Sequence, residues 1–252
     1  MTKNETAAYI KQFLIAHRGF HDNQADCPEN SMQSFRNAVE RGYGIELDVH
    51  FSKDKQLVVI HDGELNRICG VDKKVRDLTY EQLRQYPLFD SRERIPLLQN
   101  VLDVVNGQVP FVIEIKVDDP KQRGPLCEAV DTMLRSYHGA YCIESFDPGV
   151  VNWYRKHHPQ VIRGQLSCDM GKGSNLFDRI RRKALTNMWA NLYTRPDFIA
   201  YQYLGIKKTC NQFWRKRLHC MMAAWTLCDQ QAFDQAKPDF DLFIFEGFDP
   251  KW

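Results

Sequence analysis

The fold is decided by the stretch IELDVHFSKDKQLVVIHD, residues 45–62, in which two apolar runs flank the short polar segment SKDKQ. A segment this short cannot carry a crossover between parallel strands, so the two runs predict an antiparallel hairpin. Folding the hairpin about Asp54 brings His61 beside Glu46 and Asp48, level with the leucine between them. The hairpin therefore gives a mechanical reason for a histidine to meet two carboxylates.

Around this hairpin, short apolar runs alternate with amphipathic stretches along the chain, which predicts a parallel sheet covered by helices. Eight of the runs fit a TIM-type (β/α)8 barrel, an α/β fold for which 252 residues is a usual size. The hairpin's second run is the ninth, so we interpret residues 51–96 as an insertion after the second strand of a single domain, residues 1–252. The apolar runs cover residues 13–16, 45–49, 57–60, 111–117, 141–146, 161–166, 198–203, 221–227 and 242–245. The clearest helices are expected over residues 31–41, 97–105, 125–137 and 150–157.

Composition excludes several classes of protein. The net charge is +2, which gives no bulk electrostatic reason to bind nucleic acid. The eight cysteines form no C-x-x-C pair, so we expect reduced thiols in a cytoplasmic protein rather than a zinc site or a disulfide framework. No apolar run approaches the ~18 residues of a membrane span, and the N-terminus lacks the apolar core of an export signal. We therefore expect no stable membrane insertion.

Two acidic strands carry the clearest sign of a metal site. Glu46 and Asp48 alternate with apolar residues, so they lie on one face of a strand whose two faces are both buried. Buried carboxylates need a neutralising charge, and oxygen ligands suit one divalent cation, Mg²⁺ or Ca²⁺; a salt bridge is the alternative. The later run FVIEIK makes Glu114 a candidate third ligand and Lys116 a candidate phosphate contact, unless the two pair with each other.

Two histidines complete a candidate catalytic set. His17 follows an apolar run and precedes Arg18 and Gly19, at the end of a strand where barrel enzymes carry their catalytic residues. A lone histidine there would more often be a capping or core residue, but the combination favours a site. His17 and His61 can both move protons near neutral pH. Together with the acidic cluster they predict metal-assisted cleavage of a phosphate ester.

Two further features are candidates for substrate binding. The motif PENS, residues 28–31, precedes a helix that Asn30 or Ser31 can cap, and such a helix start attracts phosphate. Glu29 in this motif either faces the metal or bonds a neighbouring amide. Trp225 ends an apolar strand, where its ring either floors an alcohol-binding pocket or packs in the core.

The remaining polar residues are given structural roles or left open. Asp147 is expected to cap a helix. The basic segment 178–183, with Trp189, is interpreted as the solvated face of a barrel helix, with a membrane-surface helix as the alternative. The residues expected near the barrel mouth without an assigned role are Gln165, Gln202 and Glu246. The histidines taken as surface or structural residues are His50, His157, His158 and His219.

The motifs occur in a fixed order: HRG at 17–19, PENS at 28–31, ELDV at 46–49, VVIHD at 58–62, IEIK at 113–116, SFD at 145–147 and WT at 225–226. In this order they resemble the glycerophosphodiester phosphodiesterase family, densely as far as Lys116 and more sparsely beyond it. The resemblance implies a barrel with an insertion after its second strand. It also implies hydrolysis of glycerophosphodiesters to glycerol 3-phosphate and an alcohol, with a divalent cation.

The resemblance extends to single residues. It implies that His17 and His61 form the acid–base pair. The metal ligands implied are Glu46, Asp48 and Glu114, and the phosphate contacts implied are Arg18 and Lys116.

Two other functions fit part of the same set. A phospholipase acting on lysophospholipids would use the same barrel chemistry and would need an apolar rim. A non-catalytic barrel that binds glycerophosphodiesters or a partner protein would lack at least one acid–base or metal position, and this sequence retains them all. We expect a small-molecule substrate in each catalytic case.

The last apolar run, residues 242–245, is followed by the seven residues EGFDPKW, which leave no room for an eighth barrel helix. A helix over residues 2–12 is expected to cover that gap.

Overall fold

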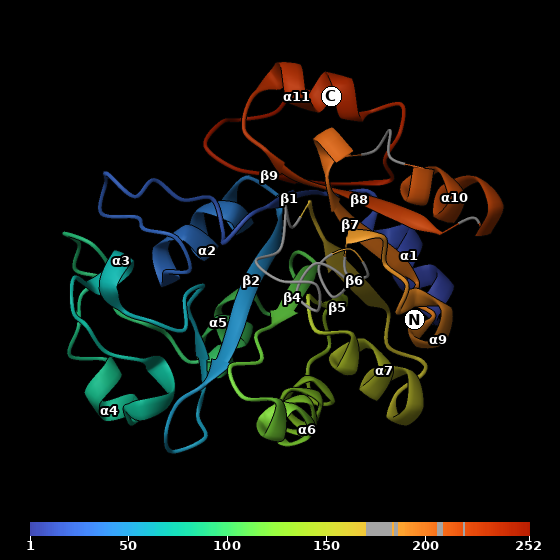
Figure 1. Cartoon of the computed structure of the whole chain (residues 1–252). Helices are drawn as coiled ribbons and strands as arrows, with labels where there is room; N and C mark the ends of the chain where they lie inside the picture. The colour runs from blue at the N-terminus through green and yellow to red at the C-terminus, as the bar shows by residue number, and fades with distance from the viewer. Residues whose placement is uncertain (170–182, 184–185, 206–208, 219) are drawn as a thin grey trace.

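Eight parallel strands close into a barrel in the computed structural model, which describes residues 1–169, 183, 186–205, 209–218 and 220–252. The barrel order is β1, β2, β4, β5, β6, β7, β8 and β9, and β1 pairs with both β2 and β9 (Figure 1). The predicted TIM-type barrel is therefore confirmed. Its strands are β1 (Leu14–Ala16), β2 (Gly44–Phe51), β4 (Phe111–Ile115), β5 (Tyr141–Ser145), β6 (Arg163–Ser167), β7 (Phe198–Gln202), β8 (Met221–Leu227) and β9 (Leu242–Phe245). The extra strand β3 (Leu57–Val59) pairs with β2.

Helices surround the barrel, and the four that the sequence predicted most clearly correspond to α2, α5, α6 and α7, each end within three residues of its expected place (Figure 1). The helices are α1 (Lys3–Ile10), α2 (Met32–Glu40), α3 (Asn66–Cys69), α4 (Tyr80–Leu83), α5 (Leu98–Val105), α6 (Arg123–Leu134), α7 (Pro148–His157), α9 (Asn191–Thr194), α10 (Thr209–Leu218) and α11 (Gln230–Ala236). Short 3₁₀ turns cover η1 (Val75–Asp77), η2 (Pro120–Gln122) and η3 (Tyr203–Gly205).

The hairpin of β2 and β3 has the predicted antiparallel register, with Val49 opposite Val59. Continuing that register by two residues places His61 opposite Leu47. Strand β4 pairs along one edge of β2, from residue 45 to residue 49. Strands β1 and β3 therefore both pair with the opposite edge of β2, β1 at the start of the strand and β3 at its end. The residues that follow β1 and β3 therefore meet along β2, and this brings His17 and His61 to one place.

Three groups of buried apolar side chains form the core. The largest lies between the strands and the outer helices, and the second fills the barrel interior around Ile15, Val112 and Phe198. Gly164 is required there, because a Cβ at this position would lie 2.2 Å from a ring carbon of Phe198. The third group belongs to the predicted insertion, residues 51–96, and shows that this segment packs around side chains of its own.

Helix α1 exists as predicted, but its predicted place was wrong. It lies across the amino-terminal end of the barrel, where Ile10 is buried against the interior cluster. Lys3 pairs with Asp197 at 2.8 Å, and Lys11 pairs with Asp241 at 3.7 Å. These carboxylates precede β7 and β9, so the helix bridges several loops at that end. The apolar barrel interior reaches this end and needs a cover that excludes water.

Residues after β9 pack against β9 and α11. The ring centroid of Trp252 lies 5.7 Å from that of Phe233 on α11 and 5.9 Å from that of Phe243 on β9. Phe248 lies 5.8 Å from Phe245 in the same way.

Two further observations concern the cysteines and the length of the helices. Cys27, Cys69, Cys127, Cys142, Cys220 and Cys228 are free thiols in the described part of the chain. Within the described ranges, none of the helices combines the length and the apolar character that crossing a bilayer requires. Most of the basic segment 178–183, and His219, lie outside the described residues.

Candidate active site

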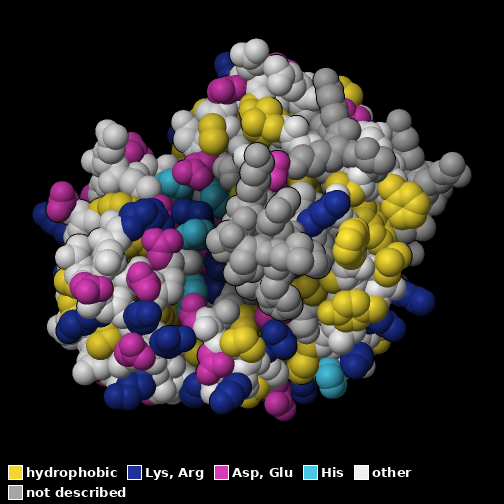
Figure 2. Space-filling view, viewed as in Figure 1, with side chains coloured by type: hydrophobic (Ala, Val, Ile, Leu, Met, Phe, Trp, Pro, Cys, Tyr) yellow, Lys and Arg dark blue, Asp and Glu magenta, His cyan; other side chains and the backbone are white. Residues whose placement is uncertain are grey.

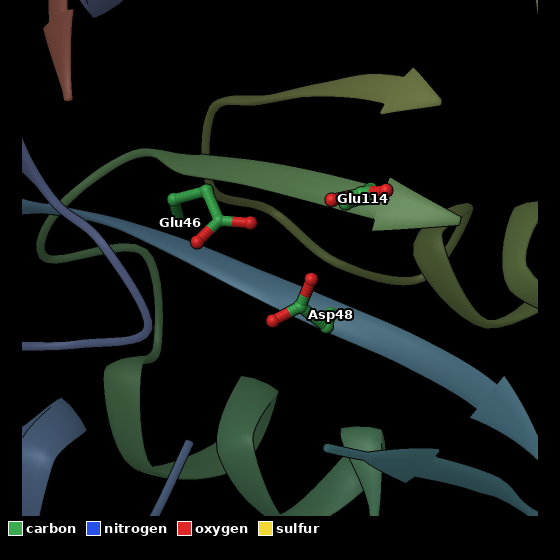
Figure 3. A group of neighbouring side chains, drawn as sticks. All are labelled: Glu46, Asp48 and Glu114. Atoms are coloured by element: carbon green, nitrogen blue, oxygen red, sulfur yellow. The ribbon is translucent and has the colours of Figure 1, made fainter. Parts of the chain in front are cut away.

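Three carboxylates converge on the adjacent strands β2 and β4. Asp48 and Glu114 are register partners on adjacent strands, and Glu46 lies on the same face of β2 as Asp48. One oxygen of each lies within 4.8 Å of an oxygen of the others, and all three side chains are buried (Figure 3). The structure thus brings together the three predicted metal ligands.

Lys116 neutralises part of this cluster. Its Nζ lies 3.0 Å from Asp48 Oδ1 and 2.8 Å from Glu114 Oε2, so the predicted alternative of an ion pair is also present. Burial nevertheless raises the pKa of Glu114 to about 7. Burial likewise raises the pKa of Glu46 well above its ordinary value, and the charges of Asp48, Glu144 and Glu114 raise it further. One lysine leaves carboxylate charge in excess, and a donor set of three carboxylates fits a divalent cation such as Mg²⁺ or Ca²⁺.

His17 is held by an acidic residue that the sequence analysis left without a role. Its Nδ1 lies 2.5 Å from Glu246 Oε2, and its Nε2 lies 3.8 Å from Glu46 Oε2. Although burial opposes it, the hydrogen bond from His17 lowers the pKa of Glu246. A tight turn follows, in which Gly19 has a φ of 79° and a Cβ would lie 2.4 Å from the Ser34 hydroxyl oxygen. That turn directs the histidine toward the carboxylates.

His61 is held in a similar way on the other side. Its Nδ1 lies 2.5 Å from Asp62 Oδ1, and burial lowers the pKa of the ring. The carbonyl of His61 lies 3.1 Å from Nε2 of His50, whose Nδ1 lies 2.7 Å from Asp118 Oδ2. His50 was expected to be a surface or structural residue, and its buried ring has the structural role, because it contacts the backbone of His61.

Glu29 does not face the metal cluster, so that predicted alternative is wrong. Arg67 donates two hydrogen bonds of 2.8 Å to its carboxylate, and Arg18 donates a third of the same length. Although burial opposes it, the hydrogen bonds from Arg67 lower the pKa of Glu29 to about 2. Arg67 also donates to Asp62 at 2.7 Å. Asp62, which contacts His61, is therefore linked to Arg18 by ion pairs that run through Arg67 and Glu29.

Asn30 and Ser31, the last two residues of the PENS motif, make hydrogen bonds that fix the start of α2 and one carboxylate of the cluster. Ser31 caps α2 by accepting a hydrogen bond of 3.1 Å from the backbone amide of Ser34. Asn30, with a φ of 55°, donates a hydrogen bond of 2.9 Å from Nδ2 to Asp48 Oδ2. The helix cap and a metal-cluster contact thus come from adjacent residues.

The site opens through two connected features. A cleft of about 900 Å³ runs from Lys116 and His61 toward the insertion, and histidines lie along the hollow in Figure 2. A small cavity of about 40 Å³ lies deeper, lined by His17, Glu46 and Trp225 among others. Trp225 therefore lies in a pocket wall, as one of its two predicted roles requires.

The structure also places the predicted helix cap Asp147 and the two glutamines that were expected near the barrel mouth. Asp147 caps α7, as predicted, by accepting a hydrogen bond of 2.7 Å from Gly149. Gln165 is buried and donates to backbone carbonyls, including that of Ser145 at 3.0 Å. Gln202 is exposed at the end of β7 and lines neither the cleft nor the small cavity.

Comparison with known proteins assigns the family. Residues 17–169, which include both histidines and all three carboxylates of the cluster, match the glycerophosphoryl diester phosphodiesterase family. The chain belongs to this family. Trp225 and Glu246 lie outside the matched segment.

Phosphodiesterases of this family are its relatives in sequence and in structure. A glycerophosphodiester phosphodiesterase of Bacillus altitudinis is 34% identical over 167 residues, 62% of this chain and 67% of the relative. A lysophospholipase D of Rattus norvegicus is 32% identical over 140 residues, 50% of this chain and 43% of the relative. The matches to several curated relatives therefore span less than two thirds of those proteins' lengths.

Two solved structures cover nearly all of the chain. A glycerophosphodiester phosphodiesterase of Thermotoga maritima has a TM-score of 0.69 at 25% identity, covering 92% of this chain and 94% of its own. An Oleispira antarctica phosphodiesterase, solved in complex with the product sn-glycerol-3-phosphate, has a TM-score of 0.72 at 19% identity, covering 93% and 92%. The second likeness concerns the fold alone, and both agree with the phosphodiesterase barrel.

Proposed function

We propose that this protein hydrolyses glycerophosphodiesters to glycerol 3-phosphate and an alcohol, with the help of one divalent cation. The observation that carries the proposal is a buried group of three carboxylates with an imidazole on each side, each imidazole held at Nδ1 by a further carboxylate. The activities for which the relatives are named support the substrate class, as does the product bound to the Oleispira antarctica enzyme.

Glu46, Asp48 and Glu114 would hold the cation, Mg²⁺ or Ca²⁺. When bound, it supplies positive charge for phosphate oxygens. Lys116 and Arg18 add fixed charges beside the same carboxylates, because Lys116 Nζ lies 3.0 Å and Arg18 Nε 3.6 Å from Asp48. Fixed positive charges in a buried site stabilise the charge that develops at phosphorus.

His17 and His61 would transfer the protons. Since a carboxylate occupies Nδ1 of each ring, Nε2 is left for chemistry in the cavity that both rings line. One ring takes a proton from the nucleophile, and the other gives a proton to the leaving alcohol oxygen. The same two transfers serve attack by water and attack by the glycerol 2-hydroxyl through a cyclic phosphate.

Cleavage of lysophospholipids is the second candidate function. Relatives include a lysophospholipase D, and large apolar side chains are exposed on the surface that carries α9 and α10 (Figure 2). Exposed apolar side chains that gather on one surface suit contact with lipid. They are Trp189, Leu192, Tyr193, Leu204 and Phe213.

The test is release of glycerol 3-phosphate from glycerophosphocholine, glycerophosphoethanolamine and glycerophosphoglycerol, with release of choline from lysophosphatidylcholine measured in parallel. Each substrate is assayed with Mg²⁺, with Ca²⁺ and with EDTA. The proposal expects release that needs a cation and is abolished by EDTA. Turnover of lysophosphatidylcholine alone would favour the second candidate, and no turnover of any substrate would contradict both.

A further inference from the structure

Five of the seven large apolar side chains that are exposed in the described part of the chain lie on one surface of the protein. Apolar side chains gather on this surface in Figure 2, and it carries α9, η3 and α10. A single exposed apolar residue is ordinary, but a gathered group marks a contact site. The five residues, between 48% and 70% exposed, form what we name the α9–α10 surface: Trp189, Leu192, Tyr193, Leu204 and Phe213.

Hydrogen bonds hold the parts of the α9–α10 surface together. Nδ2 of Asn211, near the start of α10, donates to the carbonyl of Gly205 in η3 at 2.7 Å. The thiol of Cys210 lies 3.9 Å from the carbonyl of Thr186, three residues before Trp189. The segments before and after β7 are therefore joined, and they present their apolar side chains as one surface of the folded barrel.

The same part of the chain carries the protein's excess of positive charge. The whole sequence has 34 Lys and Arg against 32 Asp and Glu, and residues 171–220 hold eleven of the basic residues but two of the acidic ones. The rest of the chain is therefore negative. Lys183 and Arg195 flank the apolar residues before and within α9, and both are exposed. Apolar and basic side chains thus occur together in this segment.

A membrane that contains anionic lipid fits both properties. Leucine and aromatic side chains enter the boundary between headgroups and acyl chains, whereas Lys and Arg attract anionic headgroups. Trp and Tyr in particular favour this boundary. A second copy of the chain fits less well, because a symmetric dimer would place two positively charged surfaces against each other. Nucleic acid would match the charge but would leave the exposed leucines without apolar contacts.

The α9–α10 surface extends to the open end of the barrel. Leu204 lies in η3, which directly follows the carboxyl-terminal end of β7. Gln202, the last residue of β7, is the register partner of Trp225 in the wall of the small cavity. A membrane that contacts this surface would therefore lie beside the mouth of the barrel.

We propose that the α9–α10 surface attaches this protein peripherally to membranes that contain anionic lipid. The apolar side chains enter the headgroup region, and the basic residues of the same segment bind the headgroups. This attachment goes beyond the proposed hydrolysis and is independent of it, because it needs neither the cation nor turnover.

The test is co-sedimentation of the full chain with two kinds of vesicle. One kind contains phosphatidylcholine alone, and the other contains phosphatidylcholine and phosphatidylglycerol in equal parts. Wild type is expected to bind the mixed vesicles at least ~10-fold more tightly, because each basic side chain near an anionic surface adds about fivefold in affinity. High salt should remove most of this preference, since it screens exposed charges.

Two double variants separate the apolar contribution from the charged one. Trp189→Ser with Leu192→Ser should weaken binding to the mixed vesicles by about 10- to 100-fold, because two large side chains no longer leave water. Lys183→Glu with Arg195→Glu should weaken binding to the mixed vesicles at least ~10-fold. The second pair should change binding to phosphatidylcholine vesicles little.

Matched controls come from outside the α9–α10 surface. Trp252→Ser removes another exposed Trp, which packs against α11 and β9. Arg84→Glu reverses an exposed charge next to α4, on the side of the barrel away from α10 in Figure 1. Both should bind the mixed vesicles like wild type. Thermal melting of every variant shows that the fold is intact.

Several outcomes would overturn the proposal. They are absence of binding to both kinds of vesicle, and equal binding by wild type and the apolar double variant. Binding of a DNA oligonucleotide as tight as that of the mixed vesicles would show a site for polyanions instead. A dimer in light scattering that the apolar double variant loses would show that a second copy covers the surface. None of these results bears on hydrolysis of glycerophosphocholine in solution, so the two proposals fail separately.

Discussion

At the scale of single residues, each histidine of the site has a carboxylate partner at Nδ1, and the two partners come from different parts of the chain. Asp62 is the neighbour of His61 in sequence, whereas Glu246 is 229 residues from His17. Such a carboxylate fixes the tautomer and the orientation of its ring. The pairing of Asp62 with His61 can therefore be read directly from the sequence. The pairing of Glu246 with His17 exists only because β9 pairs with β1 and closes the barrel.

The proposed proton transfers predict large losses when either ring is removed. His17→Ala and His61→Ala should each lower kcat by a factor on the order of 10²–10⁴, the usual contribution of an acid–base group. The control is His157→Ala, since His157 is exposed on α7 and should keep wild-type turnover. Steady-state kinetics on glycerophosphocholine measure all three variants, and near wild-type turnover of His17→Ala would refute its role.

Glu246 should act through His17 rather than on the substrate. Glu246→Gln keeps the shape of the side chain but removes the charge that lies 2.5 Å from the ring, so kcat should fall by about 10- to 100-fold. KM should change little, because the carboxylate of Glu246 contacts the ring of His17 and is not proposed to contact the substrate. Glu128→Gln, on an exposed part of α6, is the matched control. A rise in KM with unchanged kcat would show instead that Glu246 binds substrate.

At the scale of elements, short continuous apolar runs predicted the strands well, because both faces of each barrel strand are buried. The same reasoning placed Glu46, Asp48 and Glu114 on one inner face, and the hairpin register placed His61 beside them. It did not reveal that Arg67 of α3 reaches Glu29, since that contact depends on how the insertion folds over the mouth. Contacts between elements depend on loop paths, which periodicity does not encode.

The contact between Arg67 and Glu29 predicts a pH-dependent contribution to stability. Because the pKa of Glu29 is lowered from 4.5 to about 2 in the folded state, its stabilisation is complete above 4.5 and is lost as pH falls through 2. The difference corresponds to ~3 kcal/mol of unfolding free energy. Urea unfolding should show Glu29→Gln destabilised by about that amount at pH 7, and by less than half of it at pH 3.

The matched control for that experiment is Glu40→Gln, at the exposed end of α2. It should alter the unfolding free energy little at either pH. An equal loss in Glu29→Gln at pH 7 and at pH 3 would show that the carboxylate charge is not what joins α3 to the barrel.

At the scale of the whole molecule, the barrel is covered at one end and open at the other. Helix α1 lies across the amino-terminal end, and the cluster of carboxylates faces the opposite end, where the cleft opens. The sequence predicted the helix but not its place, because a short helix with few apolar positions does not indicate which apolar surface it covers. Only the closed barrel shows that its interior needs a cover there.

The covering role of α1 predicts a marked loss of stability without it. Deleting residues 1–12 should lower the melting temperature, because the interior cluster would then meet water. Ile10→Ala, a smaller change at a side chain that is 2% exposed, should lower the free energy of unfolding by about 2–5 kcal/mol. Lys11→Ala is the matched control on the exposed side, where its ion pair at 3.7 Å should contribute below ~1 kcal/mol. An unchanged melting curve for the deletion would rule out the covering role.

The carboxylate cluster predicts that the stability of the whole barrel depends on a divalent cation. Glu46, Asp48 and Glu114 are buried together, and Lys116 neutralises only part of their charge, so a bound cation should stabilise the folded state. At a concentration 100 times its dissociation constant, a ligand adds about 2.7 kcal/mol, or roughly 5–10 °C in melting temperature for a chain of this size. Calorimetry with Mg²⁺, Ca²⁺ or EDTA measures the shift. Glu128→Gln should keep it and Glu114→Gln should lose most of it; an equal shift in both variants would place the cation elsewhere on the protein.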